Sequence, residues 1–149
     1  MDFKNANELL TLCEEKNLPV SEIMRIREIE LGETASEIVN TKMTRVLEIM
    51  KDAAFSPIRQ PIKSMGGLIG GEARKLSLHA QEKRGLCGEL LQKAVTYAMA
   101  TLETNASMGL IVASPTAGSA GIVPGLLLAM QEHYDFSDEE IIQVLFNAS

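Results

Sequence analysis

The amino-acid sequence predicts an all-α fold, and three observations favour this class. Apolar side chains recur at spacings of three and four residues along most of the chain, which is typical of helices with one buried face. Aromatic residues make up only 4% of the 149 residues, so aliphatic side chains and methionine must fill the core, as they do between packed helices. A short apolar run at 110–113 is the only pattern that competes as a strand.

Length and charge exclude several classes of protein. The chain is about one domain long and can bury a core. Its net charge of −6 offers no basic surface, so we expect neither a nucleic-acid nor a membrane partner. The longest apolar run, 120–130, contains Pro124 and two glycines and is shorter than the about 20 residues that a membrane span needs. No apolar leader follows Met1, which predicts a cytoplasmic protein.

The first half of the chain predicts three helices, over 3–17, 21–32 and 34–54. Ser21 is the expected cap of the second helix, which ends at Gly32. Residues 34–37, Thr-Ala-Ser-Glu, form a capping box at the start of the third. Pro57 then predicts that the third helix has ended and that a loop follows.

The second half predicts four more helices, over 72–83, 89–102, 120–133 and 138–147. The apolar stripe of the second of these is the expected core face and comprises Leu91, Val95, Ala98 and Leu102. Pro124 begins or interrupts the third. Ser137 and Glu140 form a capping box before the last helix.

The last predicted helix is apolar around nearly its whole circumference, which indicates burial on all sides. We expect Ile142, Leu145 and Phe146 to form an apolar patch that further chain or a partner covers. An isolated chain would then form a homodimer through this patch.

Eight of the eleven glycines fall in two segments, 66–71 and 109–125. Glycines at the start of a helix bring backbone N–H groups close to an anion. The first segment lacks the Gly-Lys-Ser/Thr ending of a P-loop, so an anion site and a tight turn both remain open. Lys75, one turn into the next helix, either points its charge at the same anion or lies in solvent.

The stretch from Thr104 to Gln131 contains no charged side chain. One interpretation is a buried loop that presents N–H groups and hydroxyls to a small ligand. The other is a core turn between two hydrophobic elements, and both remain open.

The cysteines and histidines do not indicate a metal site. Cys13 and Cys87 are too few for a disulfide framework or a complete cysteine-ligated cluster, and their apolar neighbours favour small core residues. His79 and His133 have no partner histidine at metal-ligand spacing.

Three sequence blocks together resemble the α chain of bacterial iron–sulfur-dependent L-serine dehydratase. They are Met-Gly-Gly-Leu-Ile-Gly-Gly-Glu-Ala-Arg-Lys at 65–75, Asn-Ala-Ser-Met-Gly at 105–109, and Ser-Pro-Thr-Ala-Gly-Ser-Ala-Gly-Ile-Val-Pro-Gly at 114–125. The third block is the most specific, and the resemblance covers essentially the whole chain.

The resemblance implies an enzyme that converts L-serine to pyruvate and ammonia without pyridoxal phosphate. In the family, a 4Fe–4S cluster held by three cysteines leaves one iron open to polarise the leaving hydroxyl of the substrate. Loops equivalent to the three blocks line the substrate pocket. By this resemblance the substrate-binding residues are Gly66, Gly67, Gly70, Gly71, Lys75, Asn105, Ser114, Pro115, Thr116, Gly118, Ser119 and Gly121.

The cluster cysteines of the family lie in later motifs, so neither Cys13 nor Cys87 is expected to be a ligand. We therefore expect 1–149 to be the N-terminal half of an α chain, as a fragment or a short form, that lacks the C-terminal half and binds no cofactor itself. Its expected partners are L-serine, the C-terminal α segment and a separate β chain, and it would be inactive alone. No residue stands out as the base that removes the Cα proton.

Two alternatives from other classes remain open. The first is a non-catalytic helical interaction module that retains the family loops. The second is an anion-binding module that uses the 66–71 loop.

Overall fold

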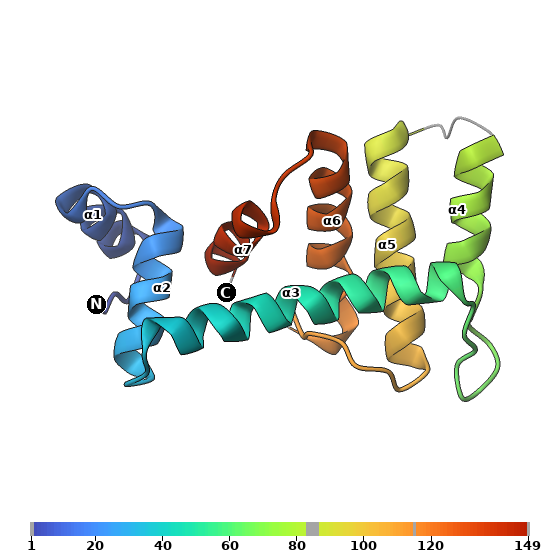
Figure 1. Cartoon of the computed structure of the whole chain (residues 1–149), viewed down its shortest axis with the longest axis horizontal. Coiled ribbons are helices and arrows are strands. Elements are labelled where there is room, and N and C mark those ends of the chain that lie inside the picture. Colours follow the sequence, from blue (N-terminus) through green and yellow to red (C-terminus); the bar gives the residue numbers. More distant parts are fainter. Residues whose placement is uncertain (1, 83–86, 115, 149) are drawn as a thin grey trace. The chain divides into compact units, whose positions relative to one another are not determined.

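The computed structural model describes residues 2–82, 87–114 and 116–148, and these residues form α-helices, one short 3-10 helix and no strand. The predicted all-α class is confirmed, and the 110–113 run has no regular structure. The helices (Figure 1) are α1 (Ala6–Lys16), α2 (Val20–Leu31), α3 (Ser36–Arg59), α4 (Glu72–Glu82), α5 (Glu89–Ala106), η1 (Ala117–Ser119), α6 (Ile122–Tyr134) and α7 (Asp138–Asn147).

The chain divides into two compact units. The first comprises Met1–Arg45 and Ser137–Ser149, and the second comprises Val46–Phe136. Helix α3 contributes its first part to one unit and its second part to the other. Both glycine-rich loops belong to the second unit.

In the first unit, the core forms where α2 packs against α7. Met24, Val39 and Phe146 form its buried cluster, and Ile142 packs against them. The capping box of Ser137 and Glu140 is confirmed: the Ser137 hydroxyl accepts the Glu140 N–H at 3.2 Å and a Glu140 carboxylate oxygen accepts the Ser137 N–H at 2.8 Å.

The expectation that the apolar face of α7 needs cover from outside is wrong for two of its three predicted residues, whereas the third, Ile142, is partly buried. Leu145 and Phe146 are 4% and 3% exposed. The cover comes from α2 and the first part of α3 within the same unit. The structural reason for expecting a homodimer through this face is therefore removed.

Two predicted helix caps are also wrong. Val20 already begins α2 after Pro19, so Ser21 lies inside the helix. Thr34 belongs to the turn that ends α2, because its N–H donates to Ile29 O at 3.1 Å and its hydroxyl donates to Gly32 O at 2.8 Å. Helix α3 begins two residues later, at Ser36.

Helix α3 does not stop before Pro57, as the sequence predicted, but continues to Arg59. Proline has no N–H, so Pro57 cannot donate to Ala53 O one turn earlier. The Thr104 hydroxyl of α5 donates to Ala53 O at 2.9 Å instead. This replacement donor satisfies the carbonyl that the buried Pro57 leaves without its helical partner.

In the second unit, α5 packs against both α4 and α6 (Figure 1). A Cβ atom at Gly121 would lie 2.6 Å from Ala98 O, and one at Gly125 would lie 2.7 Å from Ala94 O. The backbones of α5 and α6 therefore approach so closely that glycine is needed at these two positions.

This close packing reverses the predicted orientation of α5. Leu91, Val95 and Leu102, from the expected core stripe, are 52%, 45% and 38% exposed. The buried face instead carries small and polar side chains, namely Ala94, Thr96, Tyr97, Ala100, Thr101, Glu103 and Thr104. Close to Gly121 and Gly125 only small side chains such as Ala94 and Ala98 fit, so of the predicted stripe Ala98 lies at the contact and the large aliphatic side chains are exposed.

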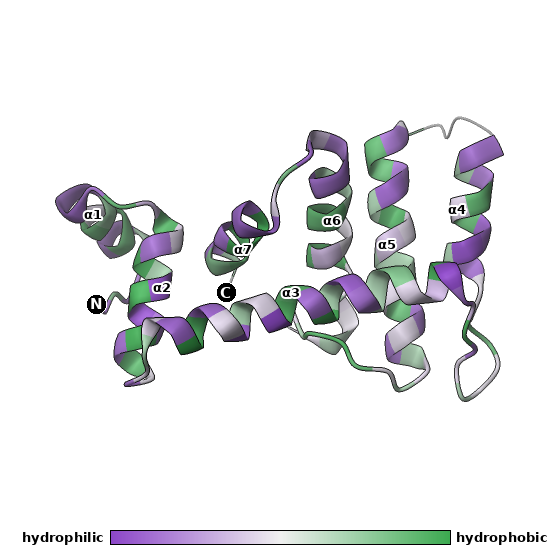
Figure 2. Cartoon of the chain, viewed as in Figure 1, coloured by the Kyte–Doolittle hydropathy of each residue, from purple (hydrophilic) through white to green (hydrophobic). Residues whose placement is uncertain are grey.

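The uncharged stretch is partly buried and partly exposed. Met108 and Leu110 are 78% and 64% exposed, whereas Leu128 and Ala129 in α6 are buried. Pro124 lies in the first turn of α6, which begins at Ile122, and does not interrupt the helix. In Figure 2 the polar residues of α6 gather at its C-terminal end, where the uncharged stretch ends. Within the part of the chain that the structure describes, no helix is both long and apolar enough to cross a membrane.

We expect Thr104→Val to destabilise the protein by about 1–3 kcal/mol, because it leaves the buried Ala53 carbonyl without its replacement donor. Denaturant unfolding measures this change. Thr101→Val is the matched control, since the Thr101 hydroxyl donates only to Tyr97 O of its own helix. It should cost less than about 1 kcal/mol.

A double-mutant cycle with Pro57→Ala isolates the effect. Alanine restores an N–H that can donate to Ala53 O, so Thr104→Val should cost less in this background by more than about 0.5 kcal/mol. An equal cost in both backgrounds would contradict the replacement role of Thr104.

Candidate functional site

Three consecutive side chains at the end of α5 bind three other segments of the second unit. Glu103 Oε1 accepts the Ala73 N–H at 2.8 Å. Thr104 Oγ1 reaches Ala53 in α3, as described above, and Asn105 Nδ2 donates to Ala117 O at 3.3 Å. Neighbouring residues of a helix point about 100° apart, so three of them can reach three directions.

These bonds attach both glycine-rich loops to the same end of α5 (Figure 1). Glu103 binds the first turn of α4, which directly follows the first loop, and Asn105 binds the second loop at Ala117. The start of α4 and the second loop at Ala117 are thereby attached to one end of α5, whereas the predicted site residue Gly121 lies against Ala98 in the middle of that helix. Lys75 lies one turn along α4 and is exposed.

The first loop, 64–71, is closed by its own backbone. The Ser64 N–H donates to Ile69 O at 2.8 Å, and the Ile69 N–H donates to the Ser64 hydroxyl at 3.1 Å. Gly70 has a φ of +143°, and a Cβ there would lie 2.0 Å from Ile62 O. Gly70 is thus required by the path of the chain, whereas Gly66 has open space around it.

Two backbone N–H groups near the start of α4 are already bound by carboxylates of the chain. The Gly70 N–H donates to Glu72 Oε2 at 2.7 Å, and the Ala73 N–H donates to Glu103. The hydrogen bond from Gly70 is the largest cause that lowers the pKa of Glu72, followed by the Glu72 backbone N–H, and the Glu103 side chain and the charge of Lys75 add smaller effects. An external anion at the predicted anion site would therefore have to compete with these carboxylates for two N–H donors.

The second loop holds its hydroxyls by contacts within itself. The Thr116 and Ser119 hydroxyl oxygens lie 3.0 Å apart, and together these residues form the capping box of η1. Ser119 Oγ also donates to Ser114 O at 2.9 Å. Gly118 is exposed at the tip, and Gly121 is buried against α5. The predicted site residue Pro115 lies outside the described residues.

Glu103 is the residue of this region that the sequence analysis missed. It is 1% exposed, and it is the last charged residue before the uncharged stretch. A single carboxylate at the end of a helix that then loses all charge is a pattern that could have drawn attention to it. The missing information was which backbone N–H group lies opposite, and that depends on the tertiary fold.

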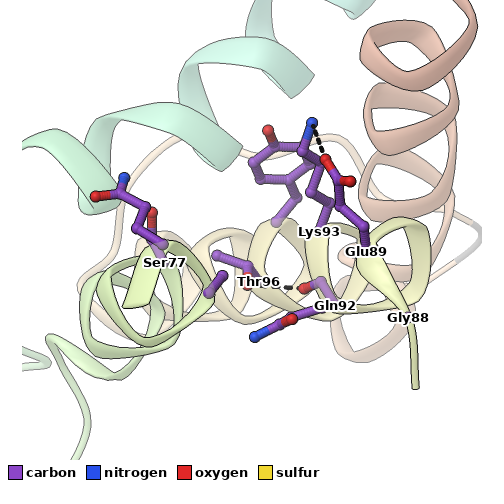
Figure 3. A pocket seen from close by; sticks show the side chains of 9 residues that line it. Ser77, Gly88, Glu89, Gln92, Lys93 and Thr96 are labelled. Carbon is purple, nitrogen blue, oxygen red and sulfur yellow. Dashed lines mark hydrogen bonds and ion pairs between the residues drawn. The ribbon is translucent and has the colours of Figure 1, made fainter. Parts of the chain in front are cut away.

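A separate cavity of about 640 Å³ lies between α4 and α5, toward the other end of α5 (Figure 3). Lys93 Nζ lies 3.5 Å from Glu89 and 3.4 Å from Glu132, and the Tyr97 hydroxyl donates to Glu132 at 2.6 Å. Burial, followed by this bond, raises the pKa of Tyr97. None of the predicted site residues that the structure describes lines this cavity, so it is distinct from the loop site.

Both cysteines are free thiols. Cys13 is half-buried on α1 in the first unit, whereas Cys87 lies in the second unit. Cys87 is exposed in the turn before α5, so its prediction as a core residue is wrong. Among the residues that the structure describes, no three His, Cys, Asp or Glu side chains lie close enough together to hold a metal ion.

Residues 15–149 match the family model for the serine dehydratase alpha chain. The chain belongs to this family. It is 40% identical over 98% of its length to the probable L-serine dehydratase alpha chain of Bacillus subtilis, and 35% identical over 95% to the L-serine dehydratase alpha chain of Peptoniphilus asaccharolyticus. It is also 32% identical over 89% to an L-serine dehydratase of Helicobacter pylori, of which it covers 29%.

The chain spans about half the length of the two alpha chains, since it covers 48% of each. No solved structure matches it. The predicted family is thus confirmed, and the similarity to these serine dehydratases includes all three sequence blocks because it extends over nearly the whole chain.

The lowered pKa of Glu72 predicts a pH dependence. A depressed folded-state pKa stabilises the fold above the unfolded value of about 4.3, and this contribution is lost as the pH falls through the folded value. We expect a carbon-13 NMR titration to place the Glu72 carboxyl midpoint below that of the same residue in the urea-unfolded chain. Equal midpoints would show that the Gly70 hydrogen bond does not hold the carboxylate.

Proposed function

We propose that this chain is part of an L-serine ammonia-lyase, which converts L-serine to pyruvate and ammonia, and that it supplies two loops of the substrate pocket. Family membership and the names of the relatives support the reaction. The observation that carries the loop assignment is their shared attachment to the end of α5 through Glu103 and Asn105.

The proposed reaction removes the Cα proton of serine and releases its β-hydroxyl as water. The resulting aminoacrylate tautomerises and hydrolyses to pyruvate and ammonia. The residues of this chain would bind and orient the substrate, since backbone N–H groups and hydroxyls can hold its carboxylate. The base stays unassigned.

The hydrogen-bonded pair of Thr116 and Ser119 supports a role in orientation. Their hydroxyls are already fixed by each other and by Ser114 O, so their directions are set before a substrate arrives. Preorganised hydroxyls of this kind lose little freedom on binding, and they would exchange one of these internal hydrogen bonds for one to the substrate. In this proposal, Gly118 leaves the tip of the loop open to the substrate, and Asn105 fixes the loop through Ala117.

We propose that the 4Fe–4S cluster implied by the resemblance is held by other parts of the complete enzyme. Three cysteines are implied, this chain contains two, and Cys13 and Cys87 belong to different units. The described residues do not fit the cluster, so no step of the reaction is assigned to it here. The partners in this proposal are a segment that corresponds to the remaining half of the related alpha chains, and a β chain.

One observation favours the alternative of a non-catalytic interaction module. Leu91, Val95 and Leu102 form an exposed apolar stripe along α5, and such surfaces often bind partners. The lyase proposal also needs partners, so the stripe does not decide between the two functions. A test of catalysis can decide between them.

The deciding experiment combines this chain with the remaining α segment and the β chain under anaerobic conditions with iron and sulfide. We expect pyruvate to form from L-serine. Thr116→Ala with Ser119→Ala should lower kcat/KM by about tenfold or more, because the oriented hydroxyls are lost. Thr41→Ala is the control, since this exposed hydroxyl donates only to Glu37 O of its own helix.

Two results would contradict the proposal in different ways. No pyruvate from the unchanged chain would contradict the lyase and favour the interaction module. Normal activity of the doubly substituted enzyme would contradict only the assignment of this loop to the pocket.

A further inference from the structure

Glu103 is a fully buried carboxyl group that the proposed reaction does not use directly. Its Oε1 atom accepts the Ala73 N–H at 2.8 Å, and Ala73 itself is 0% exposed. Its Oε2 atom is buried and meets no hydrogen bond of normal geometry among the residues that the structure describes, and the Glu103 carboxyl also interacts with the carboxyl of Glu72. Burying a carboxyl group is costly, so this placement needs a compensating interaction.

The start of α4 explains the interaction. The first N–H groups of a helix have no partner within the helix, and a buried one needs an acceptor from elsewhere. Glu72, in the first turn, directs its carboxylate to Gly70 instead. Glu103 from α5 therefore supplies the acceptor for Ala73, and it brings a carboxyl to the positive end of the helix dipole.

The position of Glu103 in α5 links this bond to the second loop. Asn105 lies two residues further along the same helix and binds Ala117, while Thr104 between them binds Ala53 in α3. A helix is rigid over so short a distance, so the anchor points of the two loops are fixed relative to each other. A change at Glu103 would release the first loop alone.

We propose that Glu103 is a positioning residue that fixes the start of α4, and with it the 64–71 loop, at the end of α5 where the second loop is also held. This role in catalysis rests on the proposed function, because it matters only if both loops line the serine pocket. Glu103 acts through the backbone of Ala73 and needs no contact with the substrate.

Two conservative variants test the length of the side chain at position 103 and its carboxyl group separately. Glu103→Gln keeps an oxygen that can accept the Ala73 N–H but replaces the carboxyl group by an amide. Glu103→Asp keeps the carboxyl group, but its side chain is one methylene shorter and cannot reach Ala73 from the same backbone position. Glu132→Asp in α6 is the control for shortening a carboxylate elsewhere in the same unit.

Amide hydrogen exchange of the 149-residue chain measures the effect without any catalysis. We expect about tenfold faster exchange at Gly70 and Ala73 in Glu103→Asp, near-normal exchange in Glu103→Gln, and no change at these amides in Glu132→Asp. The Leu128 amide in α6 reports opening of the whole unit and should stay protected in every variant.

Three results would overturn the proposal. Unchanged exchange at Ala73 in Glu103→Asp would show that the bond does not hold the loop. Exchange that is equally fast in the Gln variant would show that an acceptor at this place is not sufficient. Faster exchange at Leu128 as well would show a general structural role.

Serine turnover by the reconstituted enzyme then tests the catalytic consequence. We expect Glu103→Asp to lower kcat/KM and Glu103→Gln to restore it. An active enzyme in which Glu103→Asp equals the unchanged chain would overturn the positioning role. If even the unchanged complex fails to turn over serine, the proposed function fails, while the exchange result still decides whether Glu103 holds the loop.

Discussion

The hydrogen bond from Thr104 to Ala53 O is the constraint on which the rest of the second unit depends. Pro57 allows α3 to continue but leaves one buried carbonyl without its helical donor. The Thr104 hydroxyl satisfies it and thereby attaches the end of α5 to α3. With Thr104 bound there, Glu103 and Asn105 on either side bind the first turn of α4 and the second loop.

The close approach of α5 and α6 is the second constraint. It explains why hydropathy alone does not predict which face of α5 is buried. Gly121 and Gly125 remove the side chains that would hold the two backbones apart. The contact face of α5 is then selected by size, because only small side chains fit. Leu91 and Val95 are left outside although their spacing is typical of a core face.

The candidate site combines predictable and unpredictable parts. The glycine-rich loops, the serine and threonine cluster and the family resemblance were all accessible from the order of residues, and the family is confirmed. Glu103 was not accessible, because its role depends on a partner N–H thirty residues away. The same applies to the burial of Phe146, whose cover comes from α2 at the other end of the chain.

The sequence by itself determined the helical class, most helix boundaries and the capping box at Ser137, because these depend on interactions between residues close along the chain. Only the tertiary structure decided that α3 runs through Pro57, which face of α5 is buried and where the two loops are anchored. Each of these outcomes depends on a donor, an acceptor or a close backbone contact from a distant segment. Local periodicity contains no information about such partners.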